Sequence, residues 1–444
     1  MVKLQPMSRS APTVAERSSL ASLTAHRQGI QLAWSLAGAL PLLLGYLIAL
    51  GLEHADWVTH QFPQTVLWCA LPYLLTGHLL YRGAGLPSAE RRSLLVVTTA
   101  VPFLLTPLGF ALLQQPYSRG AVLLVYGLST AWYLLGMWLH RERSMQRLVC
   151  LDPGIAQKLQ ALVGAECLQR QPILLEPWPA GGLVLDQGWQ FDGVVLDRQV
   201  QADAARTQLL SQLKLDHVRL YSIESVAEML SGRKVSPAGQ DELWQIDGNP
   251  AYDVAKRCID LVAVLLTVPL WLSLSLVVGL AVKLDSPGPA LFRQQRVGRN
   301  GRSFCLLKFR SMVHQGAGTP ARFAQRGDDR ITRVGRVIRR WRLDELPQLW
   351  NVLGGEMSLI GPRPEQTQFV QGFASRIAAY PYRHLVRPGL TGWAQVQQGY
   401  AGSEEETVVK LSYDLYYVAH YSVALDLLIA YKTVRTILTG FGSR

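Results

Sequence analysis

Long apolar stretches occupy the first third of the chain. About 20 apolar residues in a helix are enough to cross the ~30 Å hydrocarbon core of a bilayer. Four stretches of this kind occur, at residues 30–52, 62–81, 94–113 and 121–139. The pattern therefore predicts a four-helix transmembrane domain over residues 30–140, preceded by an N-terminal tail at 1–29.

The charges in the links between these stretches predict an orientation. Lys and Arg occur in the tail, in the link after the second stretch and after the fourth stretch, whereas the first link holds Glu53 and Asp56 but no basic residue. The positive-inside rule then places the tail and the end of the fourth helix in the cytoplasm. Charged residues are scarce within the stretches, which favours an anchor over a transporter.

The pattern changes after residue 146. Short apolar segments at 148–151, 173–175, 193–196 and 217–220 alternate with helical segments at 155–163 and 203–213. Such βα alternation predicts a small parallel sheet, and we expect a Rossmann-like α/β domain over residues 146–233. No G-x-G-x-x-G follows the first strand, so we expect assembly or regulation rather than dinucleotide binding. A linker at 234–248 then leads to a last domain at 249–444.

A fifth apolar stretch, at 259–282, has basic residues on both sides. Lys256 and Arg257 precede it and Lys283 follows it. A simple span would place one basic cluster on the wrong face of the membrane, whereas a helix that enters and returns keeps both in the cytoplasm. Pro269 lies near the middle and favours a bend there. We expect a re-entrant helix hairpin, and a kinked spanning helix is the alternative.

Composition limits the classes that remain. Hydrophobic residues make up 49% of the chain and charged residues 17%, which argues against disorder. The five cysteines are widely spaced and form no C-x-x-C, which argues against a disulfide scaffold or a Cys-rich zinc site.

The positive charge of the chain is local. Residues 290–342 hold 14 Lys and Arg but only two acidic residues, a surplus equal to the net charge of +12. Nucleic acid, anionic lipid or a nucleotide diphosphate could each bind such a segment. No nucleic-acid-binding motif accompanies it, and it adjoins the predicted membrane hairpin. We therefore expect phosphate groups at the membrane interface, and no nucleic acid, as the partner.

Two adjacent carboxylates follow this basic segment. Val334, Val337, Ile338 and Trp341 have helical spacing, and their helix leads into Leu343-Asp344-Glu345-Leu346-Pro347. Pro347 suits the first turn of a new helix, whose positive end favours ionised carboxylates. Such a pair can hold a hard cation, and one member can attack phosphorus, although a helix cap is the alternative.

One arginine lies between two prolines. In Gly361-Pro362-Arg363-Pro364 the proline rings fix the backbone on both sides of Arg363. A rigidly presented guanidinium suits bidentate contact with a phosphate.

Together these motifs resemble the bacterial sugar transferase family, the monotopic-type phosphoglycosyl transferases. The resemblance covers about residues 249–444. The motifs that carry it include Ser286-Pro287-Gly288-Pro289, Lys308-Phe309-Arg310-Ser311-Met312, Asp329-Arg330-Ile331-Thr332, the Leu343–Pro347 and Gly361–Pro364 segments, and Arg387-Pro388-Gly389-Leu390-Thr391-Gly392. Four spans and a Rossmann-like domain are similar to the long members that initiate exopolysaccharide or O-antigen synthesis.

The resemblance implies a membrane α+β fold, with a re-entrant hairpin in the catalytic domain, and a reaction. A UDP-hexose, glucose or galactose in the family, gives its hexose-1-phosphate to undecaprenyl phosphate at the cytoplasmic face of the bacterial inner membrane. The products are undecaprenyl diphosphate-hexose and UMP. The hexose itself cannot be identified from these residues. Long members are thought to form homodimers, which we carry over as an expectation.

The resemblance also assigns roles. Asp344 is expected to be the covalent nucleophile that forms an aspartyl-phosphosugar, Glu345 its partner, and both are expected to lie at a Mg²⁺ site. Arg363 is expected to contact the nucleotide phosphate. Further substrate-binding positions by motif are Arg339, Lys308, Arg310, Arg330 and Arg387, and the hairpin break falls at Pro269.

A non-catalytic membrane scaffold that keeps the fold is the alternative to an enzyme. The intact pair of carboxylates and Arg363 favour the enzyme. Glycosidases also use two carboxylates, but those face each other across a sugar and are not adjacent in sequence.

Overall fold

The computed structural model describes residues 33–51, 61–83, 86–139, 146–169, 173–179, 191–201, 203–216, 218–235, 249–313, 330–398 and 404–439. The predicted tail at 1–29 and most of the predicted linker lie outside these residues. The chain divides into two compact units, Met1–Ser231 and Gly232–Arg444, and each is described by itself.

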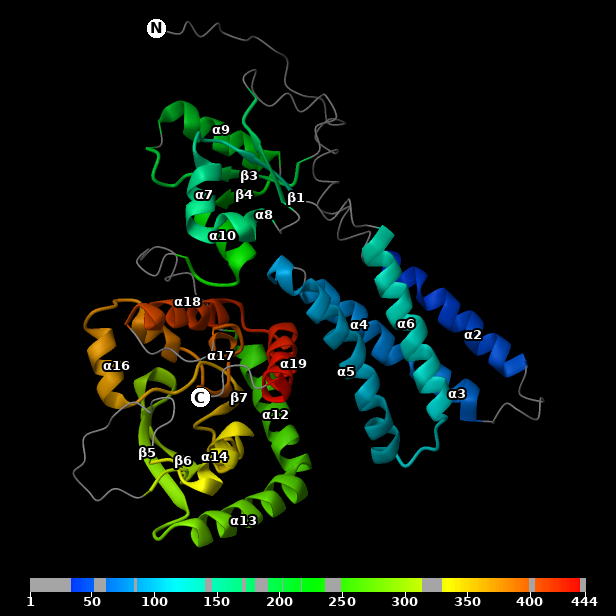
Figure 1. Cartoon of the computed structure of the whole chain (residues 1–444). Coiled ribbons are helices and arrows are strands. Elements are labelled where there is room, and N and C mark those ends of the chain that lie inside the picture. The colour runs from blue at the N-terminus through cyan, green and yellow to red at the C-terminus, as the bar shows by residue number, and fades with distance from the viewer. Residues whose placement is uncertain are drawn as a thin grey trace, which may run out of the picture. The chain divides into compact units, whose positions relative to one another are not determined.

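The first unit begins with apolar helices (Figure 1). They are α2 (Ala39–Gly51), α3 (Gln61–Trp68), α4 (Ala70–Arg82), α5 (Arg91–Leu112) and α6 (Arg119–Leu139). Across the described residues of the whole chain, α5, α6 and, in the second unit, α13 (Val268–Asp285) are long and apolar enough to cross a membrane.

Aromatic contacts join α6 to the residues before α2 and to α4. Trp34 and Trp132 stack with ring centroids 4.5 Å apart. Each indole Nε1 donates to the main-chain oxygen of the other residue, over 3.3 and 3.1 Å. Tyr73 and Tyr133 stack in the buried interior, while leucines such as Leu104 point outward. An apolar outer surface of this kind suits contact with lipid.

The rest of the first unit is a four-stranded parallel sheet in the order β2-β1-β3-β4. The predicted βα alternation is therefore confirmed. The strands are β1 (Gln146–Cys150), β2 (Ile173–Pro177), β3 (Gly193–Leu196) and β4 (Leu220–Ser222), and the helices are α7 (Ile155–Val163), α8 (Ala165–Gln169), α9 (Ala204–Leu215) and α10 (Ile223–Ser231).

The fourth strand begins later than the predicted 217–220. The main-chain nitrogen of Val218 donates to the oxygen of Leu213 over 2.9 Å, and both side chains are buried in one cluster. The residues after α9 are thus used to reverse the chain, and pairing with β3 starts only at Leu220.

Ion pairs fill the carboxyl ends of β1 and β3. Asp152 accepts hydrogen bonds from the guanidinium of Arg206 and from the main-chain nitrogen of Asp197, the latter over 2.8 Å. Asp197 in turn pairs with Lys158. Open α/β sheets bind ligands at this edge, where the strand order reverses; here the carboxylates are satisfied by the protein's own cations.

The second unit wraps helices around two small sheets. Strands β5 (Leu291–Val297) and β6 (Ser303–Phe309) form an antiparallel hairpin, and β7 (Ser358–Ile360) pairs in parallel with β8 (Gly389–Thr391). The helices are α12 (Pro250–Leu266), α13, α14 (Arg333–Arg340), α15 (Gln348–Gly354), α16 (Thr367–Ala374), α17 (Trp393–Gln397), α18 (Glu404–His420) and α19 (Val423–Thr439), with short 3₁₀ turns at η4 (Arg299–Gly301), η5 (Leu343–Glu345) and η6 (Tyr380–His384).

The fifth apolar stretch forms α12 and α13, which meet at a bend (Figure 1). Thr267 separates the two helices, and Pro269 lies in the first turn of α13. The proline has no N–H to continue the ladder of α12. The Thr267 hydroxyl donates to the oxygens of Ala263 and Val264, over 2.7 and 3.2 Å, and Trp271 Nε1 also donates to that of Val264, over 3.1 Å.

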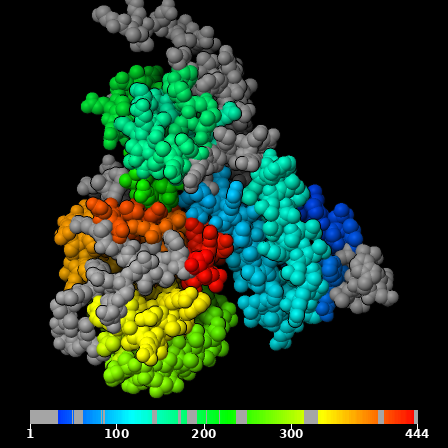
Figure 2. Space-filling view, in the orientation of Figure 1, coloured from blue at the N-terminus to red at the C-terminus, as the bar shows by residue number. Residues whose placement is uncertain are grey.

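The core of the second unit links this bend to the following segments. Val264 and Trp271 are buried together with Leu306, Val352 and Met357. A second cluster joins α13 and β6 to α14. Figure 2 shows α13 and α14 side by side at one face of this unit. The packing fixes the position of the segment between α14 and α15, which contains the two adjacent carboxylates.

Candidate active site

The two adjacent carboxylates lie in the 3₁₀ turn η5, directly before α15. Arg342 precedes them with a left-handed backbone (φ 54°), which ends α14 and turns the chain sharply. Leu343 and Leu346 are packed against the cluster around α13 and so anchor the turn. Glu345 is buried, with 6% of its surface exposed, while Asp344 is half-buried.

Cations from separate segments surround this pair. Arg363 Nη2 donates to Glu345 Oε1 over 2.6 Å, and Arg342 Nη1 lies 3.9 Å from the other oxygen of Glu345. Lys308 on β6 and Arg339 on α14 are close enough to act electrostatically on Asp344. Arg363, Lys308 and Arg339, three residues predicted to bind substrate, are therefore brought to the carboxylates by the fold.

The electrostatic environment gives the two carboxyl groups different pKa values. Burial and the neighbouring Glu345 raise the pKa of Asp344 to about 6. Burial alone would also raise the pKa of Glu345, but Arg363, Lys308 and Arg342 outweigh it and lower the pKa below its usual range. Burial and Arg363 lower the pKa of Lys308 to about 8. Glu345 is thus a fixed anion, whereas Asp344 is the more basic of the two carboxylates.

The carboxylates suit a hard cation. Asp344 has no hydrogen-bond partner among residues 249–313, 330–398 and 404–439, so its oxygens are available. No cluster of three or more His, Cys, Asp or Glu able to hold a metal occurs in the described part of the chain. Mg²⁺ commonly binds through one or two carboxylates and completes its shell with water and substrate phosphate, so the donor set fits Mg²⁺ better than a caged metal.

The backbone around Arg363 is held from two sides. Arg383 Nη2 donates to the oxygen of Arg363 over 2.8 Å, and Arg296 Nη1 donates to that of Pro364 over 3.1 Å. The main-chain nitrogen of Val297 donates to the oxygen of Glu365 over 3.0 Å. These contacts fasten the segment 363–365 to β5 and to the η6 turn.

Arg310 and Arg330, also predicted to bind substrate, have contacts with other segments. Arg310 is buried, and its two Nη atoms donate to the oxygens of Pro287 and Ser286, over 2.7 and 2.6 Å, at the end of α13. Its guanidinium is therefore used within the fold. The main chain of Arg330 accepts a hydrogen bond from Val313 over 2.8 Å.

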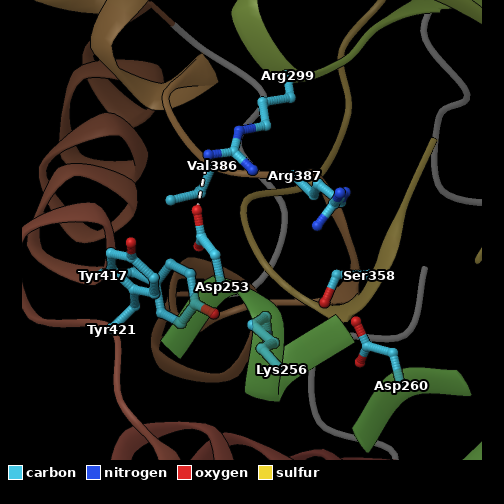
Figure 3. A pocket seen from close by; sticks show the side chains of 9 residues that line it. All are labelled: Asp253, Lys256, Asp260, Arg299, Ser358, Val386, Arg387, Tyr417 and Tyr421. Carbon is cyan, nitrogen blue, oxygen red and sulfur yellow. Dashed lines mark hydrogen bonds and ion pairs between the residues drawn. The ribbon is translucent and has the colours of Figure 1, made fainter. Parts of the chain in front are cut away.

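Arg387 faces a separate small pocket (Figure 3). The pocket is also lined by Arg299, which pairs with Asp253 over 2.7 Å, and Asp344 and Glu345 are not among its lining residues. Arg387 Nε donates to the oxygen of Gly355 over 3.1 Å, beyond the carboxyl end of α15. It thus binds the opposite end of α15 from the two carboxylates.

Comparisons with known proteins identify the family. The model of the family described as "Bacterial sugar transferase" matches residues 251–440. The UDP-N-acetylgalactosamine-undecaprenyl-phosphate N-acetylgalactosaminephosphotransferase of Aeromonas hydrophila is 40% identical over 376 residues, which cover 84% of this chain and 86% of that protein. The chain belongs to the bacterial sugar transferase family.

Two further relatives match less than half of this bacterial sugar transferase. The UDP-glucose:undecaprenyl-phosphate glucose-1-phosphate transferase of Caulobacter vibrioides is 47% identical over 191 residues, 43% of this chain and 72% of that protein. An exopolysaccharide production protein of Rhizobium leguminosarum is 39% identical over 193 residues, 42% of this chain and 96% of that protein. The bacterial sugar transferase described here is a phosphotransferase.

Sequence reasoning missed Arg296, Arg342 and Arg383 as part of this site. Arg296 belongs to the basic segment and to a motif of the family, but neither gives its contact with Pro364, because that contact joins residues 68 positions apart. Arg383 lies in a segment without a motif, and its role depends on packing. The left-handed backbone of Arg342 has no signal in the sequence, since glycine is the usual residue at such a φ.

Proposed function

We propose that this transferase moves a sugar-1-phosphate from a UDP-sugar to undecaprenyl phosphate, with release of UMP, as a first membrane step of polysaccharide synthesis. One observation supports the proposal. The adjacent carboxylates Asp344 and Glu345 are surrounded by three cations, Arg363, Lys308 and Arg339. Such an arrangement suits a diphosphate, because its negative charge needs several cations and its phosphorus needs a nucleophile.

The proposed reaction has two displacement steps at one phosphorus. An oxygen of Asp344 attacks the phosphorus that bears the sugar, the bond from that phosphorus to the bridging oxygen breaks, and UMP leaves. An oxygen of undecaprenyl phosphate then attacks the same phosphorus and releases Asp344. Arg363, held by Glu345, and Lys308 stabilise charge on the phosphate oxygens. The covalent aspartyl-phosphosugar splits one displacement into two steps.

Mg²⁺ would be held by Asp344 and Glu345 and, when bound, would supply further neutralisation of the diphosphate charge. The expected result of adding EDTA to the purified enzyme is loss of turnover, with recovery on addition of excess Mg²⁺. Full activity in EDTA, after dialysis that removes magnesium as measured by elemental analysis, would contradict the cofactor assignment.

For the sugar, we propose UDP-N-acetylgalactosamine as the first donor to test. The relative with that substrate in its name is similar over most of both chains, whereas the match to the glucose-type relative from Caulobacter covers 43% of this chain. This departs from the glucose or galactose expected at first. A panel of UDP-sugars assayed under identical conditions decides between them.

We further propose that residues 30–140 form four spans and that α12 and α13 form a re-entrant hairpin with both ends in the cytoplasm, next to the phosphates of the inner leaflet. The bend at Thr267 and the basic residues on both sides of the hairpin support this arrangement. A single added cysteine after residue 283, in a cysteine-free variant, should react only with reagents admitted to the cytoplasmic side. Labelling from the outside only would overturn the hairpin.

The domain organisation completes the proposal. Residues 146–233 would form an α/β domain for assembly or regulation, joined by a linker at 234–248 to a catalytic domain at 249–444. A homodimer is the proposed assembly, and mass photometry in nanodiscs measures it.

The decisive experiment follows the donor alone. Enzyme mixed with UDP-sugar but no lipid should release UMP and gain the mass of one sugar phosphate on the peptide that contains Asp344. Asp344→Asn should give neither. Release of UDP, or an adduct on another residue, would remove the mechanism.

A further inference from the structure

A buried ion pair lies behind Arg363 and is not used by the chemistry described so far. Arg383 Nη2, which donates to the Arg363 oxygen, also donates to Asp414 Oδ2 over 2.7 Å. Both side chains of this pair are only 2% exposed. Neither can reach a substrate, so any effect on the reaction must pass through Arg363.

The ion pair joins three segments that are far apart in sequence. Asp414 lies on α18, Arg383 in the η6 turn and Arg363 in the segment after β7. Arg383 Nη1 donates to the Tyr380 hydroxyl over 3.1 Å, and the guanidinium lies over the Tyr380 ring, 5.2 Å from its centroid. One planar group is thus fixed by a carboxylate, a hydroxyl and a ring while it holds a main-chain oxygen.

A second contact on α18 supports the same segment. Lys410, one helical turn before Asp414, pairs with Glu365, which Arg296 also approaches to 3.8 Å. Pro362 and Pro364 fix φ on both sides of Arg363. Because the backbone of residue 363 has so little freedom, a shift of its carbonyl group also shifts the direction in which its side chain leaves.

We propose that Arg383 and Asp414 are positioning residues for Arg363: they fix its backbone so that the guanidinium meets both Glu345 and the diphosphate of a nucleotide sugar. This inference rests on the proposed function, in which Arg363 binds that diphosphate. A buried ion pair is not by itself a gain in stability. The role of the Arg383–Asp414 ion pair is instead to hold the main-chain oxygen of Arg363.

The test is a double-mutant cycle on the full chain in nanodiscs, with UMP release measured at varied UDP-sugar. We expect Arg383→Lys to lower kcat by about 10- to 100-fold, because a misplacement of ~1 Å can cost 100-fold, and to leave the KM for undecaprenyl phosphate unchanged. In the Arg363→Ala background the same substitution should change kcat less than twofold. Losses that multiply in the double variant would overturn the positioning role.

A milder pair of variants covers the case in which Arg383→Lys does not fold. Tyr380→Phe removes one partner of Arg383, and we expect kcat to fall three- to tenfold with an unchanged melting temperature. The matched control is Tyr252→Phe, which removes a hydroxyl that donates to buried Asp426 over 2.7 Å, and kcat should change less than twofold. Equal effects of the two substitutions, or wild-type kcat in a folded Tyr380→Phe, would overturn the proposal.

A wrong role for Arg363 and a wrong role for Arg383 and Asp414 give different results. If Arg363→Ala keeps full activity, the proposed role of Arg363 is wrong, and a positioning role that acts through Arg363 is wrong with it. If Arg363→Ala is impaired but Tyr380→Phe and Arg383→Lys are not, only the positioning role is wrong.

Discussion

At the scale of single residues, the site contains two carboxyl groups whose surroundings differ, and so do their pKa values. Glu345 is buried against Arg363, while Asp344 is half-buried and has a raised pKa. Motifs in the sequence point to both carboxylates and Arg363, and the structure brings these residues together. The arginines that hold the Arg363 backbone could not be predicted, because Arg296 and Arg383 reach it only after distant segments have packed.

Arg363→Ala should lower kcat by about 100- to 1,000-fold, the usual cost of removing one donor that stabilises charge in a transition state. Arg363→Lys should recover little, since an ammonium group cannot make two parallel contacts. Steady-state UMP release measures both. Recovery to half the wild-type rate with lysine would show that charge alone is enough.

Protonation of His384 should make stability depend on pH. His384 is buried, and burial and Arg383 lower its pKa to about 4, against about 6.5 when unfolded. The unfolded chain binds the extra proton between these values, so the stability contributed is complete above about pH 6.5 and lost as pH falls towards 4, on the order of 3 kcal/mol. Melting temperatures across this range should rise with pH, and less steeply in His384→Gln.

At the scale of elements, the apolar and polar pattern predicted the parallel strands of the first unit and a bend within residues 259–282. It did not predict β5 to β8, and residues 62–81, expected as one helix, form α3 and α4. It misplaced β4, because the pattern does not show how many residues a helix end needs to reverse the chain. It likewise gave no indication that α18 would supply the partners of Arg383 and Glu365.

Pro269→Leu should restore a continuous helix across the bend, since leucine supplies the missing N–H and has a high helix propensity. The expected result is a tenfold or greater loss of transferase activity together with external labelling of a cysteine placed after residue 283. Val268→Leu, at the neighbouring position, is the control and should change neither. Unchanged labelling in an inactive Pro269→Leu protein would show that Pro269 is needed for activity but does not determine how the chain crosses or re-enters the membrane.

At the scale of the whole molecule, the chain consists of two units of similar size, each with buried clusters of its own. The relative from Rhizobium is matched over 96% of its length by 42% of this chain. A relative of that length has no counterpart for more than half of this chain.

Removal of residues 1–231 should leave a membrane-bound transferase. Helices α12 and α13, both carboxylates and Arg363 all lie in the remaining unit. We expect kcat within tenfold of the full chain, measured as UMP release from washed membranes at equal protein amounts. A folded but inactive fragment would assign an essential part of catalysis to the first unit.

The junction between α12 and α13 has one more consequence. A break in a helix normally leaves main-chain oxygens without a hydrogen-bond donor, and the hydrocarbon core of a bilayer contains almost no water to supply one. Here the Val264 oxygen is already satisfied by an indole and a hydroxyl from its own neighbourhood. In the proposed hairpin, the chain would therefore reverse with this main-chain oxygen satisfied by the protein itself, without water or lipid headgroups at the bend.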